Sequence, residues 1–244
     1  MRRSTLELEL VLVLVRQRTM SIPRLVHQLW IDPFGASLPL PEDSAQNVQQ
    51  WRASHADFAH RLWSLDELEH ALPEHLRPTF RRVITPVRLP AMQADVARLF
   101  ILAAFGGIWI DLKLIPRRRF LDQLMRYKLV LIEHFPAPKG VDPTGSLTNS
   151  FIASEPGHEF VLHCLEIVVA KVERRCNGDV WMITGPGALM AARNELTASG
   201  RFSDAHVLRH QLVWNDLLTL RSASYNSYGR HWSRRQKAEP LYLY

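Results

Sequence analysis

The stretch from Leu89 to Pro116 carries four ionisable side chains in an otherwise apolar sequence. Asp95 and Arg98 are three residues apart, a spacing that puts both on one face of a helix. Asp111 and Lys113 are two apart, a spacing that puts both on one side of a strand. Carboxylates accept hydrogen bonds from hydroxyl groups, and arginine or lysine can hold an anion or stabilise developing negative charge. These residue types therefore predict a polar site for a hydroxylated, anionic ligand.

Two explanations of these four residues remain open at this stage. In the first, Asp95 and Arg98 form a purely structural ion pair, and Asp111 and Lys113 lie at a solvated strand end. In the second, the four residues form a ligand site at the carboxyl end of a strand in an open α/β sheet. Burying charge is unfavourable unless the charge is paired, as in the first explanation, or used, as in the second.

A helix followed by a strand must position these side chains. Pro90 suits the first turn of a helix, and apolar residues then continue to Phe105. Gly106 and Gly107 supply the stop, because glycine tolerates the left-handed conformation that ends many helices. The sequence from 108 to 115 predicts a short buried strand.

Strands and helices alternate along the rest of the chain, which predicts an α/β fold with a mostly parallel sheet. The first strand, 22–31, carries His27, Gln28 and Trp30 near its end, although a lone histidine there is more often a core residue than a ligand. Ser64 and Glu67 form a capping-box pattern that starts a helix. The remaining predicted strands are 60–63, 129–133, 148–153, 181–186 and 207–214, and the remaining helices are 47–52, 65–71, 120–126, 156–175 and 187–199.

Composition limits the classes of partner. The chain has 244 residues, 47% of them hydrophobic, and a formal net charge of +6. Such a basic balance favours anionic partners such as nucleotide phosphates, acidic glycans or an anionic membrane surface. Nucleic acid is not expected, because the arginines are scattered and no nucleic-acid module is present. The two cysteines lack metal-binding spacing, which favours reduced thiols and a cytoplasmic location, with Cys164 in the core.

The first 20 residues differ from the rest. The apolar run from Leu10 to Val15 is too short to span a bilayer, and Glu7 and Glu9 argue against a secretory signal. We expect residues 1–20 to be an extension outside the fold, and residues 21–244 to form one domain with a basic C-terminal tail.

Five ordered stretches together resemble glycosyltransferase family 32, the DXD-containing sugar-binding glycosyltransferases, a group that includes mannosyltransferases. Asp95-x-x-Arg98 followed by Gly106-Gly107-Ile108-Trp109-Ile110-Asp111 resembles the family's "DxxR…GGxYxDxD" core. The other four stretches are IPRLVHQLW at 22–30, FIASEPGHEF at 151–160, TGP at 184–186 and, more loosely, 228–232. The resemblance covers about residues 21–233.

This resemblance implies a GT-A fold, a single Rossmann-like α/β domain. It also implies transfer of a hexose, with retention of anomeric configuration, from a UDP- or GDP-sugar to a glycan, polysaccharide or lipid-linked acceptor. This transfer reaction would belong to polysaccharide biosynthesis. We expect a cytoplasmic enzyme whose basic surface makes peripheral contact with a membrane.

The resemblance also implies roles for individual residues. Asp95 and Arg98 would contact the donor's sugar and its phosphate end, and Asp111 would lie near the ribose and a Mn²⁺ or Mg²⁺ ion. Asn149 would lie near the donor sugar, and His231 and Trp232 would close over the diphosphate. The other residues expected to bind substrate are His27, Gln28, Trp30, Gly106 and Gly107.

One departure from the family pattern affects the predicted chemistry. Lys113 stands where the family has its second DXD carboxylate, and a protonated lysine cannot ligate a metal. Lys113 can itself supply the positive charge, or Asp111, His231 and the phosphates can hold the metal while Lys113 neutralises phosphate. As a third alternative, catalysis is impaired and the protein only binds a nucleotide sugar.

Overall fold

The computed structural model describes residues 21–32, 38–134, 146–226 and 231–243. The expected N-terminal extension, residues 1–20, lies outside the described residues. The same is true of residues 33–37, 135–145 and 227–230. Within the described residues, no helix has both the length and the apolar character needed to cross a bilayer.

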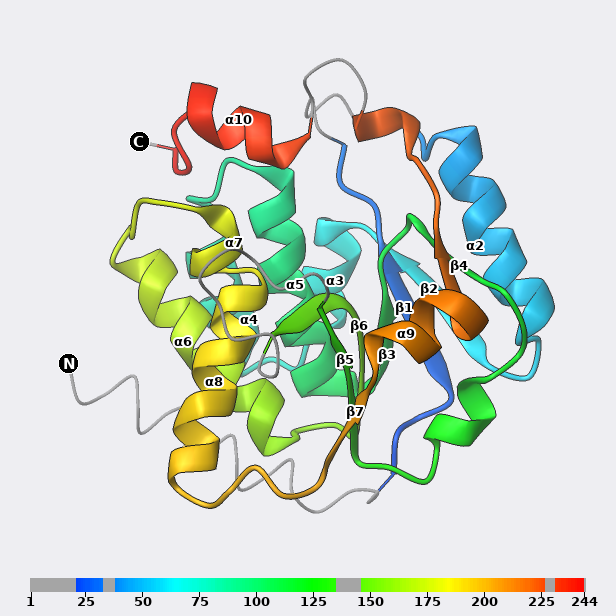
Figure 1. The fold of residues 1–244 in the computed structure, drawn as a ribbon. Coiled ribbons are helices and arrows are strands. Elements are labelled where there is room, and N and C mark those ends of the chain that lie inside the picture. Colours follow the sequence, from blue (N-terminus) through cyan, green and yellow to red (C-terminus); the bar gives the residue numbers. More distant parts are fainter. Residues whose placement is uncertain (1–20, 33–37, 135–145, 227–230, 244) are drawn as a thin grey trace.

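A six-stranded sheet forms the centre of the molecule, in the order β2-β1-β3-β6-β5-β7 (Figure 1). The sheet was expected to be mostly parallel, and three of its five neighbouring pairs, β1–β2, β1–β3 and β5–β7, are parallel. Only β6 runs antiparallel to both of its neighbours among these strands. The mostly parallel α/β sheet is thus confirmed. The strands are β1 Leu25–Leu29, β2 Ala59–Trp63, β3 Gly107–Ile110, β5 Leu129–Glu133, β6 Leu147–Ser154 and β7 Ala205–Leu208.

The sheet separates two hydrophobic cores. Alternate residues of β3 enter different cores: Trp109 packs on one side, and Ile108 and Ile110 pack on the other. The larger core lies under α3 Leu65–Ala71, α4 Arg77–Ile84, α5 Pro90–Phe105, α6 Glu159–Glu173 and α8 Pro186–Ala198, and it includes buried Cys164 as predicted. The smaller core lies under α2 Glu42–Ser54, with Trp51 fully buried (Figure 1).

Helix α5 is almost completely buried, which explains its apolar sequence on every face. It begins with Pro90 and ends before Gly106, as predicted. Gly106 and Gly107 both have positive φ, and a Cβ on Gly106 would lie 2.5 Å from the backbone nitrogen of Pro156. Only glycine allows the chain to turn from α5 into β3 in this space.

The expected strand over 108–115 is wrong in one respect. It breaks after β3, and β4 Leu114–Pro116 pairs instead with β8 Leu218–Leu220 in a separate two-stranded sheet. Asp111 and Lys113 therefore lie in the intervening turn, where the Leu114 amide donates to the Asp111 carbonyl. Their proximity comes from a turn and not from one face of a strand.

Two further strand predictions are corrected. Residues predicted as a strand at 181–186 form α7 Val180–Ile183, whose first turn is capped by the Asp179 side chain. The strand expected at 207–214 ends at Leu208, and the chain continues through α9 His210–Leu212 and the π-helix η3 Val213–Leu217. The capping box of Ser64 and Glu67 is confirmed, and α3 spans the predicted residues. Shorter elements are η1 Leu121–Leu124, η4 Ser224–Asn226 and α10 Trp232–Ala238.

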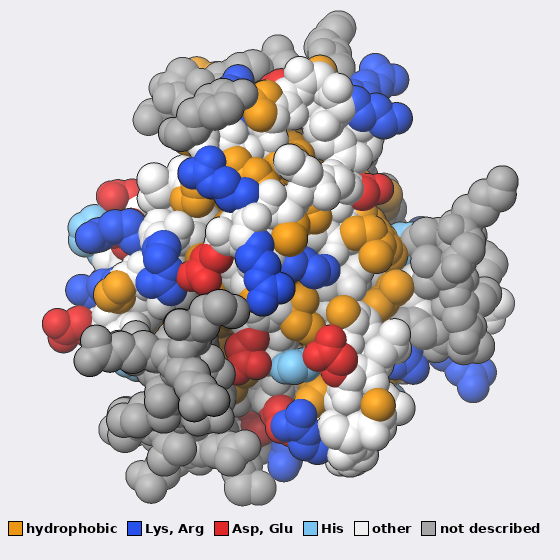
Figure 2. Space-filling view, turned by 90° about the vertical axis from the view of Figure 1, so that its left-hand side faces the viewer, with side chains coloured by type: hydrophobic (Ala, Val, Ile, Leu, Met, Phe, Trp, Pro, Cys, Tyr) orange, Lys and Arg blue, Asp and Glu red, His pale blue; other side chains and the backbone are white. Residues whose placement is uncertain are grey.

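The net positive charge is not concentrated on the face seen in Figure 2, which is the left-hand side of Figure 1. Lys and Arg side chains there are interspersed with Asp and Glu side chains. Ion pairs across elements of the described structure include Arg82 with Glu173 and Arg201 with Glu159.

Candidate functional site

A cavity of about 520 Å³ opens beyond the carboxyl end of β3, between α5, the β3–β4 turn, β6, α7 and α10. This volume is typical of small-molecule sites, and the position matches the rule for ligands in open α/β sheets. Five of the seven tryptophans of the chain line it: Trp30, Trp109, Trp181, Trp214 and Trp232.

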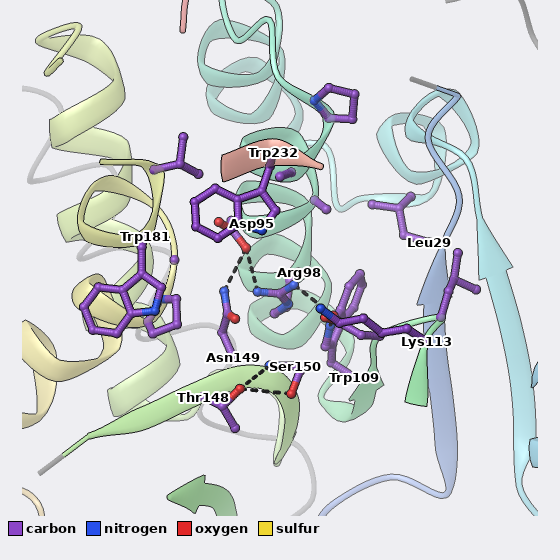
Figure 3. Close-up of a pocket in the computed structure, with 18 of the residues that line it drawn as sticks. Leu29, Asp95, Arg98, Trp109, Lys113, Thr148, Asn149, Ser150, Trp181 and Trp232 are labelled. Atoms are coloured by element: carbon purple, nitrogen blue, oxygen red, sulfur yellow. Dashed lines mark hydrogen bonds and ion pairs between the residues drawn. The ribbon is translucent and has the colours of Figure 1, made fainter. Parts of the chain in front are cut away.

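Asp95 lies on α5 at the cavity wall and receives three hydrogen bonds, of which Figure 3 shows those from Arg98 and Asn149. The Arg98 guanidinium donates to Oδ1 at 2.8 Å, and the Asn149 amide on β6 donates to the same oxygen at 2.8 Å. The Thr184 hydroxyl donates to Oδ2 at 3.0 Å. Burial raises the pKa of Asp95, and the contacts with Arg98 and Thr184 oppose that effect. The carboxylate therefore has one rotamer and a fully specified orientation.

Arg98 connects Asp95 with Asp111. Its Nη2 donates to Asp111 Oδ1 at 3.1 Å, and the Trp109 indole N–H donates to the same oxygen at 2.9 Å. The guanidinium also lies over the Trp109 ring, 4.8 Å from its centroid. Arg98 has only 4% of its side chain exposed, so one buried cation serves two carboxylates at the cavity wall.

Lys113 lines the same cavity from the β3–β4 turn. Within the described parts of the chain its ammonium has no ion-pair partner, whereas Arg98 is committed to Asp95 and Asp111. Lys113 is close enough to His231 to lower the pKa of that imidazole, although burial of His231 is the larger cause. A bound anion would therefore meet an available cation at Lys113.

Eight of the twelve residues predicted to form the site line this cavity. They are Trp30, Asp95, Arg98, Asp111, Lys113, Asn149, His231 and Trp232. Their individual roles stay predictions.

The other four predicted site residues do not line this cavity. His27 is fully buried: Trp63 donates to Nδ1 at 3.0 Å, which leaves Nε2 to donate to the Gly106 carbonyl at 3.0 Å. Burial lowers the pKa of His27 to about 4, so it is a neutral core residue. Gln28 is buried beside it in β1, and Gly106 with Gly107 serves the turn into β3.

The sequence did not reveal several residues of the cavity. Trp181, which lines the cavity, and Thr184, which holds Asp95 from behind it, fell in a predicted strand, although Asp179 before Trp181 is a helix-start signal that could have corrected this prediction. Tyr225 packs edge-on against Trp30 at 5.6 Å, and no local pattern marks that contact. Burial raises the pKa of Tyr225, and the negative charges of Asp111 and Asp43 raise it further.

The predicted metal ligands Asp111 and His231 both line the cavity, and an ion there would depend on substrate phosphates for further ligands. The described residues contain no group of three or more His, Cys, Asp or Glu side chains that could hold a metal ion. Asp111 Oδ1 already accepts two hydrogen bonds, and His231 Nδ1 is engaged with its own neighbour Ser233. Lys113 occupies the position from which a second carboxylate would act.

Comparisons with known proteins define the class. Residues 41–131 match the family model "Glycosyltransferase sugar-binding region containing DXD motif", a range that contains Asp95, Arg98 and Asp111. The fold is that of GT-A glycosyltransferases, as predicted. It superimposes on a solved structure titled "PaToxG Glycosyltransferase" with a TM-score of 0.56 and 13% identity, covering 99% of each chain. The ligand-free glycosyltransferase domain of the YGT toxin gives 0.56 at 9% identity over 86% of this chain and 83% of that one.

Curated relatives give a narrower comparison. Mannosyl phosphorylinositol ceramide synthase CSH1 of Saccharomyces cerevisiae is 30% identical over 145 residues, which is 59% of this chain and 35% of that protein. Inositol phosphoceramide mannosyltransferase 2 of Schizosaccharomyces pombe is 26% identical over 171 residues, 68% of this chain and 44% of that protein. The chain spans well under two thirds of the length of these relatives. Sequence and fold together relate it to glycosyltransferases, which confirms the prediction at that level.

Proposed function

We propose that this protein is a retaining glycosyltransferase of the family 32 type, which transfers a hexose from a nucleotide sugar to a glycan or lipid-linked acceptor. The observation that carries the proposal is the buried Asp95–Arg98–Asp111 network with Lys113 beside it, all at one cavity. A purely structural ion pair would not need a cavity of about 520 Å³ over it. The names of the yeast relatives support mannose as the transferred sugar and an inositol-containing lipid as the acceptor.

In this proposal, the oxygens of Asp95 and the amide of Asn149 bind hydroxyl groups of the donor sugar. Their mutual hydrogen bond at 2.8 Å holds both groups in place before the ligand arrives. Preorganised polar groups of this kind need no rearrangement during the reaction. Trp30 and Tyr225, which pack edge-on, would form the wall for the nucleobase.

Transfer breaks the bond between the sugar's C1 and the diphosphate oxygen, and the bonding electrons leave with the diphosphate. The acceptor hydroxyl oxygen forms the new bond to C1, and its proton leaves with the nucleoside diphosphate. Positive charge next to the departing phosphate lowers the barrier. Lys113 is placed to supply it, since within the described residues its ammonium has no competing carboxylate.

A nucleotide-release assay tests this proposal with UDP- and GDP-sugars, in Mn²⁺ and separately in EDTA. We expect release to persist in EDTA and Lys113→Ala to lower turnover by roughly 10² to 10³, the usual effect of removing one charge-stabilising group. Lys113→Arg should retain part of the activity. Lys237→Ala removes an exposed charge from α10 and is the matched control.

The results separate the alternatives. Unchanged turnover in Lys113→Ala would rule out a leaving-group role for this lysine. Release in Mn²⁺ but not in EDTA would indicate that a metal ion, held with the help of the substrate phosphates, stabilises the leaving diphosphate in place of Lys113. Nucleotide-sugar binding without any release, including with an acceptor, would favour the second candidate function, a catalytically impaired nucleotide-sugar-binding protein. That candidate rests on lysine replacing the second DXD carboxylate.

A further inference from the structure

Helix α7 carries Trp181 to the edge of the cavity and fixes its position relative to Asp95. The Asp179 side chain caps the helix by accepting from the Trp181 amide at 2.9 Å. At the other end, Thr184 donates to Asp95 Oδ2 at 3.0 Å. A Cβ on Gly187 would lie 2.7 Å from Met182 Cα, so α8 packs directly against this turn. The backbone of Trp181 is thus fixed by contacts at both ends of α7.

The cavity side chains follow an order across Figure 3. Trp181 lies at one side, Asp95 and Asn149 lie in the middle, and Lys113 with Leu29 lies at the opposite side. This step rests on the proposed function, in which the diphosphate is at Lys113 and the donor sugar at Asp95. The part of the cavity on the side of Trp181 is then left for the body of the acceptor, whose reacting hydroxyl reaches C1 on the face that the diphosphate leaves.

The groups on that side have a defined chemistry. Trp181 is partly exposed, and the His134 ring packs against it edge-on, with centroids 6.4 Å apart. Glu133, the residue before His134, also lines the cavity, and its Oε2 accepts from the His210 amide at 3.2 Å. Within the described residues, Oε1 of Glu133 has no hydrogen-bond donor. An apolar aromatic face and a carboxylate oxygen therefore both border the cavity, and His134 links them as the neighbour of Glu133 in sequence and of Trp181 in space.

We propose that Trp181 and Glu133 form the acceptor subsite, which binds a hydroxylated six-membered ring, either a sugar or a cyclitol. The face of an indole ring is electron-rich and attracts the C–H bonds on one face of such a ring. A carboxylate accepts hydrogen bonds from the hydroxyls at the rim of the ring. An acyclic polyol offers the same hydroxyls without a rigid C–H face, so the subsite discriminates by ring shape.

The test compares myo-inositol and methyl α-mannopyranoside with acyclic mannitol as probes. Saturation-transfer NMR in the presence of UDP or GDP measures probe binding, and nucleotide release with product mass measures use of the probe. We expect wild-type protein to favour the two ring probes over mannitol. Trp181→Ala should raise the KM for the ring probes about tenfold and abolish the preference over mannitol, and Glu133→Gln should raise the same KM. Met182→Ala, with a 49% exposed side chain on the same turn, is the matched control and should behave as wild type.

Two results would overturn the subsite while leaving the proposed function intact. One is donor turnover by wild-type protein with no binding of either ring probe, or with an unchanged KM in Trp181→Ala. The other is a large rise in the Kd for the free nucleotide in Trp181→Ala, which would place the nucleobase against this indole. Absence of both nucleotide binding and donor turnover in wild-type protein would instead refute the proposed function.

Discussion

Replacing Arg98 by Met removes the one cation that contacts both Asp95 and Asp111. The Arg98 side chain is 4% exposed, and the two carboxylates are 10% and 21% exposed, so neither regains full solvation. Removing one partner of a buried ion pair usually costs about 3–5 kcal/mol, because the remaining charge stays buried. For a domain of this size, that loss corresponds to a fall in Tm of roughly 6–20 °C.

The pH dependence of this loss in stability provides a second, independent test of the ion-pair network. Arg98 lowers the pKa of Asp95, whereas burial raises it, so Arg98→Met raises that pKa further. A carboxyl whose folded pKa lies above its unfolded value stabilises the fold at low pH and loses that contribution as pH rises through the folded pKa. The difference in free energy of unfolding between Arg98→Met and wild type should therefore be larger at pH 8 than at pH 5.

Urea unfolding at both pH values measures these effects. Arg98→Met combined with Asp95→Asn should recover part of the loss, because no buried anion remains at position 95. Arg82→Met breaks an ion pair with Glu173 that is 51% and 35% exposed, and it should cost less than about 1 kcal/mol. A loss below 1 kcal/mol in Arg98→Met, or a loss that Asp95→Asn does not reduce, would refute the description of this network as a buried, mutually dependent ion pair.

Three further predictions concern the residues that support the site. Burial lowers the pKa of both His27 and His55 to about 4 from 6.5, so the unfolded chain binds more protons below pH 6.5. The free energy of unfolding should therefore fall as pH drops from 6.5 to 4, by up to about 3 kcal/mol for each histidine. In His55→Gln, the free energy of unfolding measured with urea should vary less with pH. Gly107→Ala should lower Tm strongly or prevent folding, since φ is 89° and a Cβ would lie 2.6 Å from a β1 carbonyl oxygen; a change under 2 °C would contradict this. Thr184→Val should cost about 1.5–3 kcal/mol and raise the donor KM by releasing Asp95, whereas Thr184→Ser should restore both values.

The sequence predicted most elements whose signals are local. The helix over residues 90–105 followed from Pro90, an uninterrupted apolar run and the terminal glycine pair. Helix α3 followed from the capping box of Ser64 and Glu67. In both cases the residues that specify the element lie within it or next to it, so no distant contact was needed.

The sequence was less informative where distant segments compete for the backbone. The break after β3 occurs because β4 pairs with β8, about 100 residues later in the chain. Trp181 lies in an apolar segment that suits a strand, but capping by Asp179 and packing against α8 make it a helix. A short apolar run does not by itself distinguish the two structures.

The residues of the site also fall into two groups, those that local sequence predicted and those that tertiary contacts decided. The sequence by itself determined that Asp95, Arg98, Asp111 and Lys113 sit on adjacent elements, because their spacing and the surrounding apolar residues are local properties. Only the tertiary structure decided that His27 is a core residue, that Trp181 lines the cavity and that buried Thr184 holds Asp95. Burial and hydrogen-bond partners depend on which segments meet in space, as with Thr184 and Asp95, which are 89 positions apart in the sequence.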